Sequence, residues 1–491
     1  MTSHRTLLPH AVTQTPAILP NHTQVQSAHL VGICGSGMKA LAELLAGLGW
    51  RVSGSDQQAS NPTMIAMQQR GLRVHAGHHD GHVPEHADVV VYSPAVGPQN
   101  PERQMATRLK IPQLSYSQML GHLMQTRRGV CIAGTHGKST TTAMTASILT
   151  AAGLDPCAIV GAELRDRHVS GWAGKGDLMV VESCEYQRSF LDLRPQYAAV
   201  MNIEADHFDY FEDLEDAQKA FAEFVSLLPA DGHLLVNGEN QSATEIMRYS
   251  QAECETFRVA HPHETDHFGV DWLAHDVRPT GEGQRFRIFH QGDFFAELLI
   301  RLPGRHSVWN ALAAAALSHA AGADAYSIKE ALAEFTGIRR RFDRIGSWRG
   351  ITLIDDYAHH PTAVAATLQA AREEFGDRKI WCAFQAHQVS RTTALLDEFA
   401  ESLTPADVVL LPPIYAAREQ LTSEPYLVAQ RLARAVNDKG GNARFLPALD
   451  RIVSTIEDEA APGDVLLTMG AGDIDQVQYE FTRRLSRDHT A

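Results

Sequence analysis

The chain has 491 residues, with 43 Lys and Arg against 58 Asp and Glu, which gives a formal net charge of −15. This balance argues against non-specific binding to nucleic acid or to an anionic membrane, since either would require a basic face. The length suggests about three domains. The hydrophobic content of 44% and charged content of 21% are those of an ordinary globular protein, and no apolar run approaches the ~18 residues of a membrane span.

Residues 1–27 predict a flexible leader. They are polar and mixed, with three prolines, and lack the apolar core of a secretory signal. The six cysteines are widely spaced and form no CxxC pair. This pattern favours reduced, mostly buried cysteines and therefore a cytoplasmic location.

Residues 28–125 alternate short apolar runs with helical patterns. The predicted elements are a strand at 29–34, a turn at 35–38, a helix at 39–49, and strands at 51–56 and 88–93. Strand, helix and strand at this spacing form a βαβ unit. The segment therefore predicts a parallel, Rossmann-like domain with buried strands.

Two further α/β blocks follow, at 126–336 and 337–491. The first has predicted strands at 178–182 and 197–202, an antiparallel insertion within 255–302, and an alanine-rich helix at 310–321. The second has predicted strands at 351–356, 380–384, 408–411 and 465–468, and a helix at 361–374. We expect a central domain of P-loop ATPase type with a mostly parallel sheet, followed by a Rossmann-like C-terminal domain.

The stretch GTHGKSTTT, residues 134–142, lies between an apolar strand and a helix. Amide groups at a helix start bind anions, because they have no partner within the helix and carry the positive end of the dipole. Gly134 and Gly137 let the backbone curl around a phosphate, and Lys138 adds a positive charge. The spacing is two residues shorter than in GxxxxGK[ST]. Strand, GKS and helix together predict ATP binding.

A Mg²⁺ ion would be held near this loop by oxygen ligands. Ser139 offers a hydroxyl at the helix start, and Glu182 ends a strand, at the carboxyl edge of the sheet where such sites lie. His207 follows another strand of the same block. The alternatives are a solvated acid for Glu182 and a loop histidine bonded to backbone for His207.

A family resemblance rests on six stretches in a fixed order. They are GTHGKSTTT, the strand-end Glu182, NIEADHFDYF, the segment from Pro303 to Leu312, GIRRRF and DDYAHHPTAV. Together these resemble the Mur ligase family over residues 28–475. The resemblance is greatest to members that join L-alanine to UDP-N-acetylmuramate, carried by 32–38, 52–56, 355–362 and 384–392.

The resemblance implies a reaction in peptidoglycan precursor synthesis. ATP phosphorylates the lactyl carboxylate of UDP-N-acetylmuramate, and the amine of L-alanine attacks the acyl phosphate to form an amide. Phosphorylation supplies the good leaving group that a carboxylate lacks, so the enzyme mainly positions groups and neutralises charge.

The resemblance also implies a role for each matching residue. Lys138, His207 and Arg341 are catalytic. ATP is bound by Gly134, Thr135, His136, Gly137, Lys138, Ser139, Thr140, Asn310, Arg341 and Asp356, with Asn310 reading adenine. UDP-sugar is bound by Gly35, Ser36, Gly37, Met38, Asp56, Ser93 and Asn100. The amino acid is bound by Tyr357, His359, His387 and Arg391, whose guanidinium fork suits a carboxylate. Mg²⁺ is bound by Ser139, Glu182 and His207.

The sequence departs from the family pattern in three places, one of which is His306-Ser307, where the family has an HN pair before the asparagine that reads adenine. Residues 182–190 read ESCEYQRSF where the family has EADESDxSF, which removes two aspartates and adds Arg188. Gln388 replaces an arginine beside His387. We expect a monomer or homodimer with no nucleic-acid partner.

Four alternatives remain open at this stage. One is the related ligase that joins UDP-N-acetylmuramate to a tripeptide for recycling. Another is the member that adds D-glutamate, although 200–209 lacks the lysine those members carbamylate. The third is an NAD-dependent oxidoreductase, which the glycines of 32–38 support only weakly because they miss the GxGxxG offsets. The fourth is a non-enzymatic protein gated by ATP.

Overall fold

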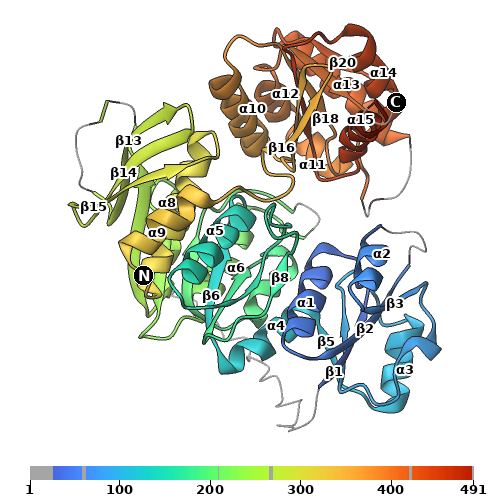
Figure 1. Cartoon of the computed structure of the whole chain (residues 1–491), viewed down its shortest axis with the longest axis vertical. Helices are drawn as coiled ribbons and strands as arrows, with labels where there is room; N and C mark the ends of the chain where they lie inside the picture. The colour runs from blue at the N-terminus through green and yellow to red at the C-terminus, as the bar shows by residue number, and fades with distance from the viewer. Residues whose placement is uncertain are drawn as a thin grey trace, which may run out of the picture. The chain divides into compact units, whose positions relative to one another are not determined.

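The computed structural model describes residues 26–57, 62–207, 210–261, 263–264, 269–417, 419 and 423–488. Nearly all of the predicted leader, 1–27, lies outside the described residues. The chain divides into two compact bodies, one reaching to Arg127 and including Gly171–Ala173, and the other containing the remainder (Figure 1). No helix among the described residues is both long and apolar enough to span a bilayer.

The first body is built on a parallel five-stranded sheet. Its elements are β1 (Ser27–Val31), α1 (Ser36–Gly47), β2 (Arg51–Asp56), α2 (Pro62–Gln69), β3 (Arg73–Ala76), η1 (Asp80–His82), β4 (Val89–Tyr92), α3 (Pro101–Leu109), β5 (Gln113–Ser115), α4 (Tyr116–Leu123), η2 (Met124–Thr126) and β8 (Gly171–Trp172). The strand order is β3-β2-β1-β4-β5, with every pair parallel. The Rossmann-like prediction is confirmed.

One turn in this body was placed wrongly from the sequence. Residues 36–38 of the predicted turn belong to α1, which begins at Ser36 with Gly35 as its N-cap, and β1 ends at Val31. The chain turns at Gly32, whose φ of 82° is costly for any residue with a Cβ, and Gly35 N donates to Gly32 O over 3.3 Å. The helix therefore starts three residues earlier than its hydrophobic pattern indicates.

The second body begins with a long central sheet. Its elements are β6 (Arg128–Ala133), α5 (Lys138–Ala151), β7 (Cys157–Ile159), β9 (Leu178–Glu182), η3 (Tyr186–Asp192), β10 (Pro195–Val200), α6 (Leu214–Val225), β11 (His233–Asn237), α7 (Gln241–Glu245), η4 (Ile246–Tyr249), β12 (Glu253–Val259), β13 (Trp272–Thr280), β14 (Gly283–His290), β15 (Asp293–Ile300), α8 (Arg305–Ala320) and α9 (Ala325–Glu334). From β15 the order runs β14, β13, β12, β11, β10, β6, β9 and β7.

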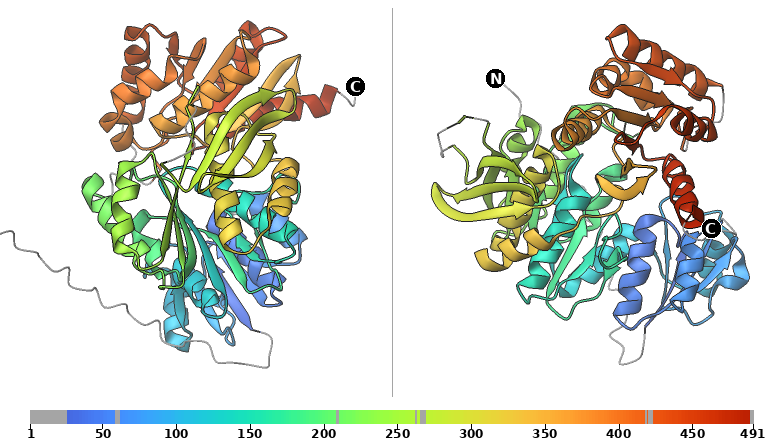
Figure 2. Two further views of the ribbon diagram at one scale, coloured as in Figure 1. Left: turned by 90° about the vertical axis from the view of Figure 1, so that its left-hand side faces the viewer. Right: turned by 45° about the horizontal axis from the view of Figure 1, so that its top comes forward.

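The central sheet is parallel in one part and antiparallel in the other. The pairs from β7 to β13 are parallel, whereas β13, β14 and β15 pair antiparallel. The antiparallel prediction for 255–302 is therefore confirmed for these three strands, but they extend the central sheet instead of forming an insertion (Figure 2). Helix α5 packs against α8 and α9, and α8 begins at Arg305, five residues before the predicted start.

A third sheet completes the second body. Its elements are β16 (Asp343–Trp348), β17 (Ile351–Asp356), α10 (Pro361–Phe375), β18 (Ile380–Phe384), α11 (Val389–Ala394), α12 (Leu396–Leu403), β19 (Val408–Leu411), α13 (Glu424–Asp438), β20 (Ala443–Phe445), α14 (Leu449–Glu459), β21 (Val465–Met469) and α15 (Asp475–Asp488). The order is β16-β17-β21-β18-β19-β20, and only β16 pairs antiparallel.

Strand β18 shows why this sheet is covered on both faces. Cys382 and Phe384 pack into one apolar core, while Trp381 and Ala383 between them pack into the other. All four side chains are buried. Because neighbouring side chains of a strand point to opposite faces, an unbroken apolar run requires helices above and below. The mixed α/β organisation expected from the sequence is confirmed.

Candidate active site

The phosphate loop joins β6 to α5 as the sequence predicts. Gly134 and Gly137 have φ of 133° and 83°, so both lie in the region that favours glycine. A Cβ on Gly137 would lie 2.6 Å from Asn310 Oδ1, which places Asn310 against the loop. Asn202 holds the loop from the other side, because its Oδ1 accepts from His136 N at 2.7 Å and its carbonyl accepts from Thr135 N at 3.0 Å.

Lys138 is paired with a buried carboxylate. Its Nζ donates to both oxygens of Glu185, at 2.9 and 3.1 Å, and to the carbonyls of Gly134 and Thr135. Burial alone would lower the pKa of Lys138, but the charge of Glu185, together with Cys184, Glu182 and the hydrogen bond to Glu185, raises it. Burial likewise would raise the pKa of Glu185, yet Lys138 holds it below its usual value. Both groups are therefore charged at neutral pH.

The sequence did not identify Glu185 as a buried partner of Lys138. It is 3% exposed, and His207 Nε2 lies 3.6 Å from its Oε1, so it connects Lys138 with His207. One feature of the sequence could have indicated it: Glu185 comes three residues after Glu182, just beyond the carboxyl end of β9. Arg188, which the family pattern lacks, does not take part in this pairing. Its side chain donates to Glu223 of α6 at 2.7 Å.

The predicted metal ligands lie on three segments next to the phosphate loop: Ser139 in α5, Glu182 in register with Ile132 of β6, and His207 beside the Glu185 that pairs with Lys138. Ser139 is 4% exposed, in the first turn of the helix, and its Oγ is 3.4 Å from Arg341 Nη2. Glu182 ends β9, and its Oε2 accepts from Gly161 N at 2.9 Å. A hydroxyl and a carboxylate are donors that Mg²⁺ accepts. Ser139 and Glu182 therefore suit the ion by their chemistry, and the assignment of Ser139, Glu182 and His207 as its ligands stays a prediction.

Arg391 also has a buried carboxylate partner. Its Nε and Nη2 lie 2.8 and 2.5 Å from Asp206 Oδ1, and the two side chains are 2% and 7% exposed. The remaining group, Nη1, lies 3.4 Å from His387 Nδ1. The pair joins the segment after β10 to α11, across 185 residues of sequence. All three nitrogens of the guanidinium thus already contact Asp206 or His387, and its binding of a substrate carboxylate stays a prediction.

The other residues predicted to bind the amino acid gather beside Arg391. The rings of His359 and His387 lie 6.0 Å apart, and the ring of Tyr357 lies 5.3 Å from that of His359. Burial, followed by the charge of Arg391, lowers the pKa of His387 to about 4 and holds that of His359 well below its usual value. Both imidazoles are therefore neutral at pH 7.

Asp356, predicted to bind ATP, has both carboxylate oxygens bonded to backbone. They accept from Phe342 N and Ala358 N, each at 2.7 Å. These bonds fix the segment that carries Arg341, whose guanidinium lies 4.7 Å from the ring of Tyr357. The structure thus shows a structural role for Asp356, and its contact with nucleotide stays a prediction.

The residues predicted to bind UDP-sugar lie in the first body. Gly35 precedes α1, and Gly37 faces the ring of Tyr116 at a distance that leaves little room for a Cβ. Asp56 Oδ2 accepts from Cys34 N at 2.9 Å. Ser36 and Met38 lie in the first turn of α1, and Ser93 follows β4. The carboxyl ends of β1, β2 and β4 thus carry most of the predicted set, where nucleotides bind in such sheets.

Asn100 caps α3, accepting from Glu102 N and Arg103 N, so its side-chain oxygen has local partners. The residue it positions, Glu102, was not identified from the sequence and is fully buried. Its carboxylate accepts from Ser55 Oγ at 2.6 Å and lies 3.0 Å from His29 Nε2. Burial alone would raise the pKa of Glu102, but the bonds from His29 and Ser55 lower it to about 2.

We expect Glu102→Gln to destabilise the chain by about 3–5 kcal/mol at pH 7, because a charged buried partner is lost. A lowered carboxyl pKa contributes stability above pH 4.5 that is lost as the pH falls towards 2. The difference between variant and wild type should therefore shrink over that range, measured by urea unfolding. The exposed Glu85→Gln is the matched control. A difference independent of pH would contradict the role of the carboxylate charge.

Comparison with known proteins covers almost the whole chain. Three Mur ligase family models match it: the family's catalytic domain at 27–128, its middle domain at 132–318 and its glutamate ligase domain at 340–472. A UDP-N-acetylmuramate–L-alanine ligase from Acidithiobacillus ferrooxidans is 39% identical over 479 residues, covering 94% of this chain and 99% of its own length. A protein of the same name from Acetivibrio thermocellus is 37% identical over 457 residues, covering 93% and 95%.

Two solved structures resemble the fold over nearly its full length. A UDP-N-acetylmuramate–alanine ligase from Thermotoga maritima has a TM-score of 0.78 and 26% identity, covering 94% of this chain and 99% of its own. A murein peptide ligase from Psychrobacter arcticus has a TM-score of 0.70 and 27% identity, covering 93% and 98%.

A phosphate loop on a mostly parallel sheet, faced by arginine and histidine side chains from a third α/β sheet, defines an ATP-dependent synthetase. The chain belongs to the Mur ligase family. The alternative of an NAD-dependent oxidoreductase is therefore wrong, because these matches identify a ligase that forms amide bonds.

Proposed function

We propose that the chain joins L-alanine to the lactyl carboxylate of UDP-N-acetylmuramate, with ATP converted to ADP and phosphate. The observation that carries this proposal is that one body holds both the phosphate loop and the cluster of Arg391, His387 and His359. The names of the relatives, at 37–39% identity over most of the chain, support the choice of substrates.

The geometry suits the formation and capture of an acyl phosphate. Free amides at the start of α5 and the charge of Lys138 would stabilise the transferred phosphoryl group. Arg341, just before β16 of the third sheet, contacts Ser139 at the same helix start. Its guanidinium would neutralise further negative charge on the phosphoryl group. Ser139, Glu182 and His207 would hold Mg²⁺, which when bound supplies further charge neutralisation.

The amino acid would bind at Arg391 and the two neutral histidines. The guanidinium of Arg391 suits an α-carboxylate, which would replace the long contacts of Nη1 with Nδ1 and the carbonyl of His387, at 3.4 and 3.5 Å. A neutral imidazole can accept a hydrogen bond from the ammonium group, whereas an imidazolium cannot. The lowered pKa values of His359 and His387 therefore favour binding of the amine and its approach to the acyl phosphate.

The test is ADP release by the purified chain. We expect release only when ATP, Mg²⁺, UDP-N-acetylmuramate and L-alanine are all present, together with a product larger by one alanyl residue in mass spectrometry. Release that is independent of alanine would contradict the proposal.

The second candidate is tripeptide addition, which the similarity to the murein peptide ligase favours. Replacing alanine with tripeptide distinguishes the two.

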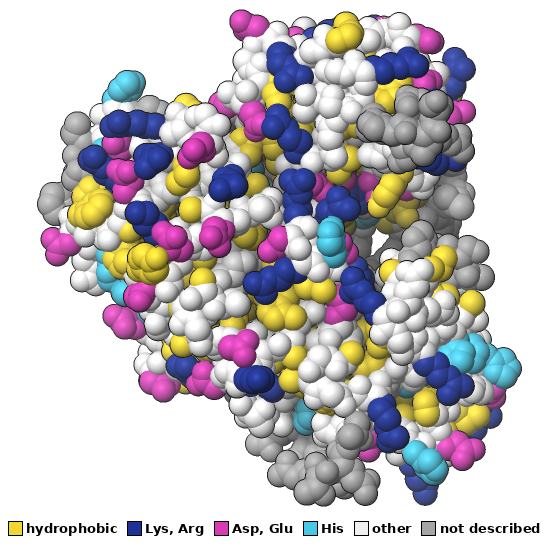
Figure 3. Space-filling model, in the orientation of Figure 1, with side chains coloured by type: hydrophobic (Ala, Val, Ile, Leu, Met, Phe, Trp, Pro, Cys, Tyr) yellow, Lys and Arg dark blue, Asp and Glu magenta, His cyan; other side chains and the backbone are white. Residues whose placement is uncertain are grey.

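We further propose a cytoplasmic monomer or homodimer that binds no nucleic acid. The net charge of −15 supports the last point. On the face shown in Figure 3, basic side chains are interspersed with acidic ones. The six cysteines are unpaired, which suits a reducing compartment.

A further inference from the structure

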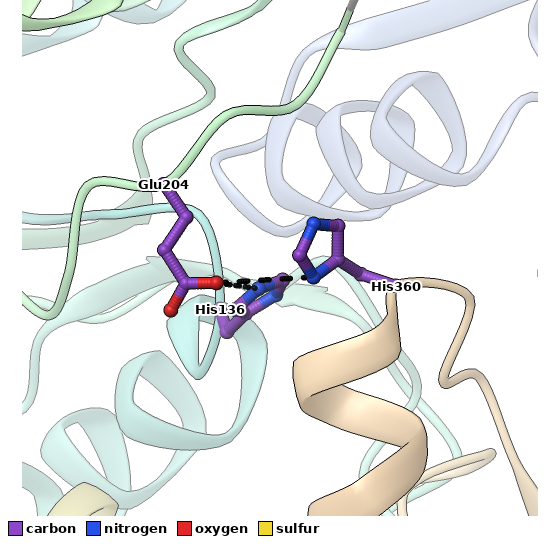
Figure 4. Close-up of side chains that lie close together, drawn as sticks. All are labelled: His136, Glu204 and His360. Carbon is purple, nitrogen blue, oxygen red and sulfur yellow. Dashed lines mark ion pairs between the residues drawn. The ribbon is translucent and has the colours of Figure 1, made fainter. Parts of the chain in front are cut away.

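A second cluster of metal-binding side chains lies beside the phosphate loop. His136 of the loop, Glu204 after β10 and His360 before α10 place three ligand atoms within 4.8 Å of one another. Figure 4 shows the carboxylate and the two imidazoles facing one another from three separate segments. Among the residues that the structure describes, this is the one group of three or more His, Cys, Asp or Glu side chains so arranged.

The separations are close to those of a coordinated ion. Glu204 Oε2 lies 3.4 Å from His136 Nε2 and 3.8 Å from His360 Nδ1. Two ligands that bind Zn²⁺ tetrahedrally at about 2.1 Å lie roughly 3.4 Å apart. Of the three pairs of ligand atoms, one already has this separation, the second needs to close by a few tenths of an ångström, and the third, between the two histidines, lies within 4.8 Å.

The histidines lack other partners for these nitrogens. His360 is 6% exposed, and neither of its ring nitrogens makes a hydrogen bond. His136 Nε2 is also buried without one. An unpartnered buried polar group lowers stability, so such groups usually have a ligand or a bonding partner. A cation at the centre of the cluster would satisfy all three atoms.

We propose that His136, Glu204 and His360 bind Zn²⁺ or a similar divalent transition-metal ion, separately from the Mg²⁺ ligands proposed above. Two imidazoles and a carboxylate form the donor set of three-ligand zinc sites, which leave a fourth position open. A donor set with two imidazoles suits such ions, whereas the proposed Mg²⁺ ligands, with one imidazole, include a hydroxyl and a carboxylate. Thr362 Oγ1 donates to Glu204 Oε2 at 2.8 Å, which orients the carboxylate from outside the cluster.

The position of the site gives the ion a structural consequence. His136 belongs to the phosphate loop, while His360 is the residue before α10 of the third sheet. A bound ion would therefore fasten the loop to the third sheet, and it would stabilise the folded chain by mass action. The inference rests on this geometry and does not depend on the proposed ligase reaction.

The experiment titrates Zn²⁺ into the chelator-treated full chain, with excess Mg²⁺ to occupy oxygen-rich sites and a competing chromogenic chelator to report affinity. We expect His360→Phe to bind one equivalent fewer than wild type. Zn²⁺ should raise the melting temperature of wild type but not that of the variant. Co²⁺ should give wild type a visible absorption band that His360→Phe lacks.

Two further variants separate ligation from a purely structural role. Because His360 has no hydrogen bond, His360→Phe should fold and melt no lower than wild type when metal is absent. Should it fail to fold, Glu204→Gln provides the same test. Thr362→Val removes only the outer bond and should weaken Zn²⁺ binding roughly 10–100-fold.

The matched control is His290→Phe in the central sheet. His290 Nε2 lies 2.8 Å from Glu255 Oε1, so this imidazole already has a carboxylate partner. We expect this variant to bind as many equivalents of Zn²⁺ as wild type. Equal stoichiometry and affinity in wild type, His360→Phe and Glu204→Gln would overturn the proposal.

Discussion

Lys138→Ala should reduce alanine-dependent ADP release by roughly 10³-fold or more, because the variant loses the mobile charge that stabilises the transferred phosphoryl group. The amides at the start of α5 remain, so nucleotide binding should weaken less than turnover falls. Steady-state kinetics and equilibrium binding of a non-hydrolysable ATP analogue measure the two effects separately. Near-normal turnover in the variant would refute the assignment of the loop.

The Lys138–Glu185 pair provides a control for folding. Removing the lysine alone leaves the buried charge of Glu185 with only His207 beside it, at 3.6 Å, which should cost about 3–5 kcal/mol of stability. The double variant Lys138→Ala/Glu185→Gln removes that charge. We expect the double variant to recover much of the melting temperature while ADP release stays low. Recovery of both would mean that the lysine serves the fold and not the phosphate.

The second large effect is expected from Arg391→Ala. Its guanidinium is the proposed site for the α-carboxylate of alanine, and removing it should raise the KM for alanine about 100-fold, while the KM for ATP changes little. The variant should also unfold about 3–5 kcal/mol more readily, because Asp206 loses its buried partner. Kinetics at varied alanine and urea unfolding measure the two results.

Two variants separate the substrate role of Arg391 from its pairing role. Arg391→Lys keeps the charge but not the fork, so it should retain more stability than Arg391→Ala and still have a raised KM for alanine. Asp206→Asn removes the partner carboxylate, whose pKa the charge of Arg391 holds down against burial. An unchanged KM for alanine in Arg391→Lys and Arg391→Ala would show that the guanidinium only holds Asp206.

The parallel strands of the second body were predictable because buried strands contain unbroken apolar runs. Strands β9, β17, β18 and β19 lie where the sequence predicts them, with the same end residues. Helix starts were less predictable. Helices α1 and α8 begin three and five residues early, since Gly35 and Gly304 at their N-caps determine the start and the apolar pattern begins later.

The phosphate loop was determined by the sequence itself, because its chemistry is local. Gly134, Gly137, Lys138 and Ser139 are neighbours in the chain, and any strand that turns through them into a helix presents free amides and a lysine. Only the tertiary structure decided the partners of those groups. Glu185 lies beside Lys138, Asp206 beside Arg391, and His136 beside Glu204 and His360. These pairings join residues that are 47 positions apart at the least, for Lys138 and Glu185, and 224 at the most, for His136 and His360. Burial and distance between such segments follow from how the sheets pack, and no local pattern in the sequence encodes them.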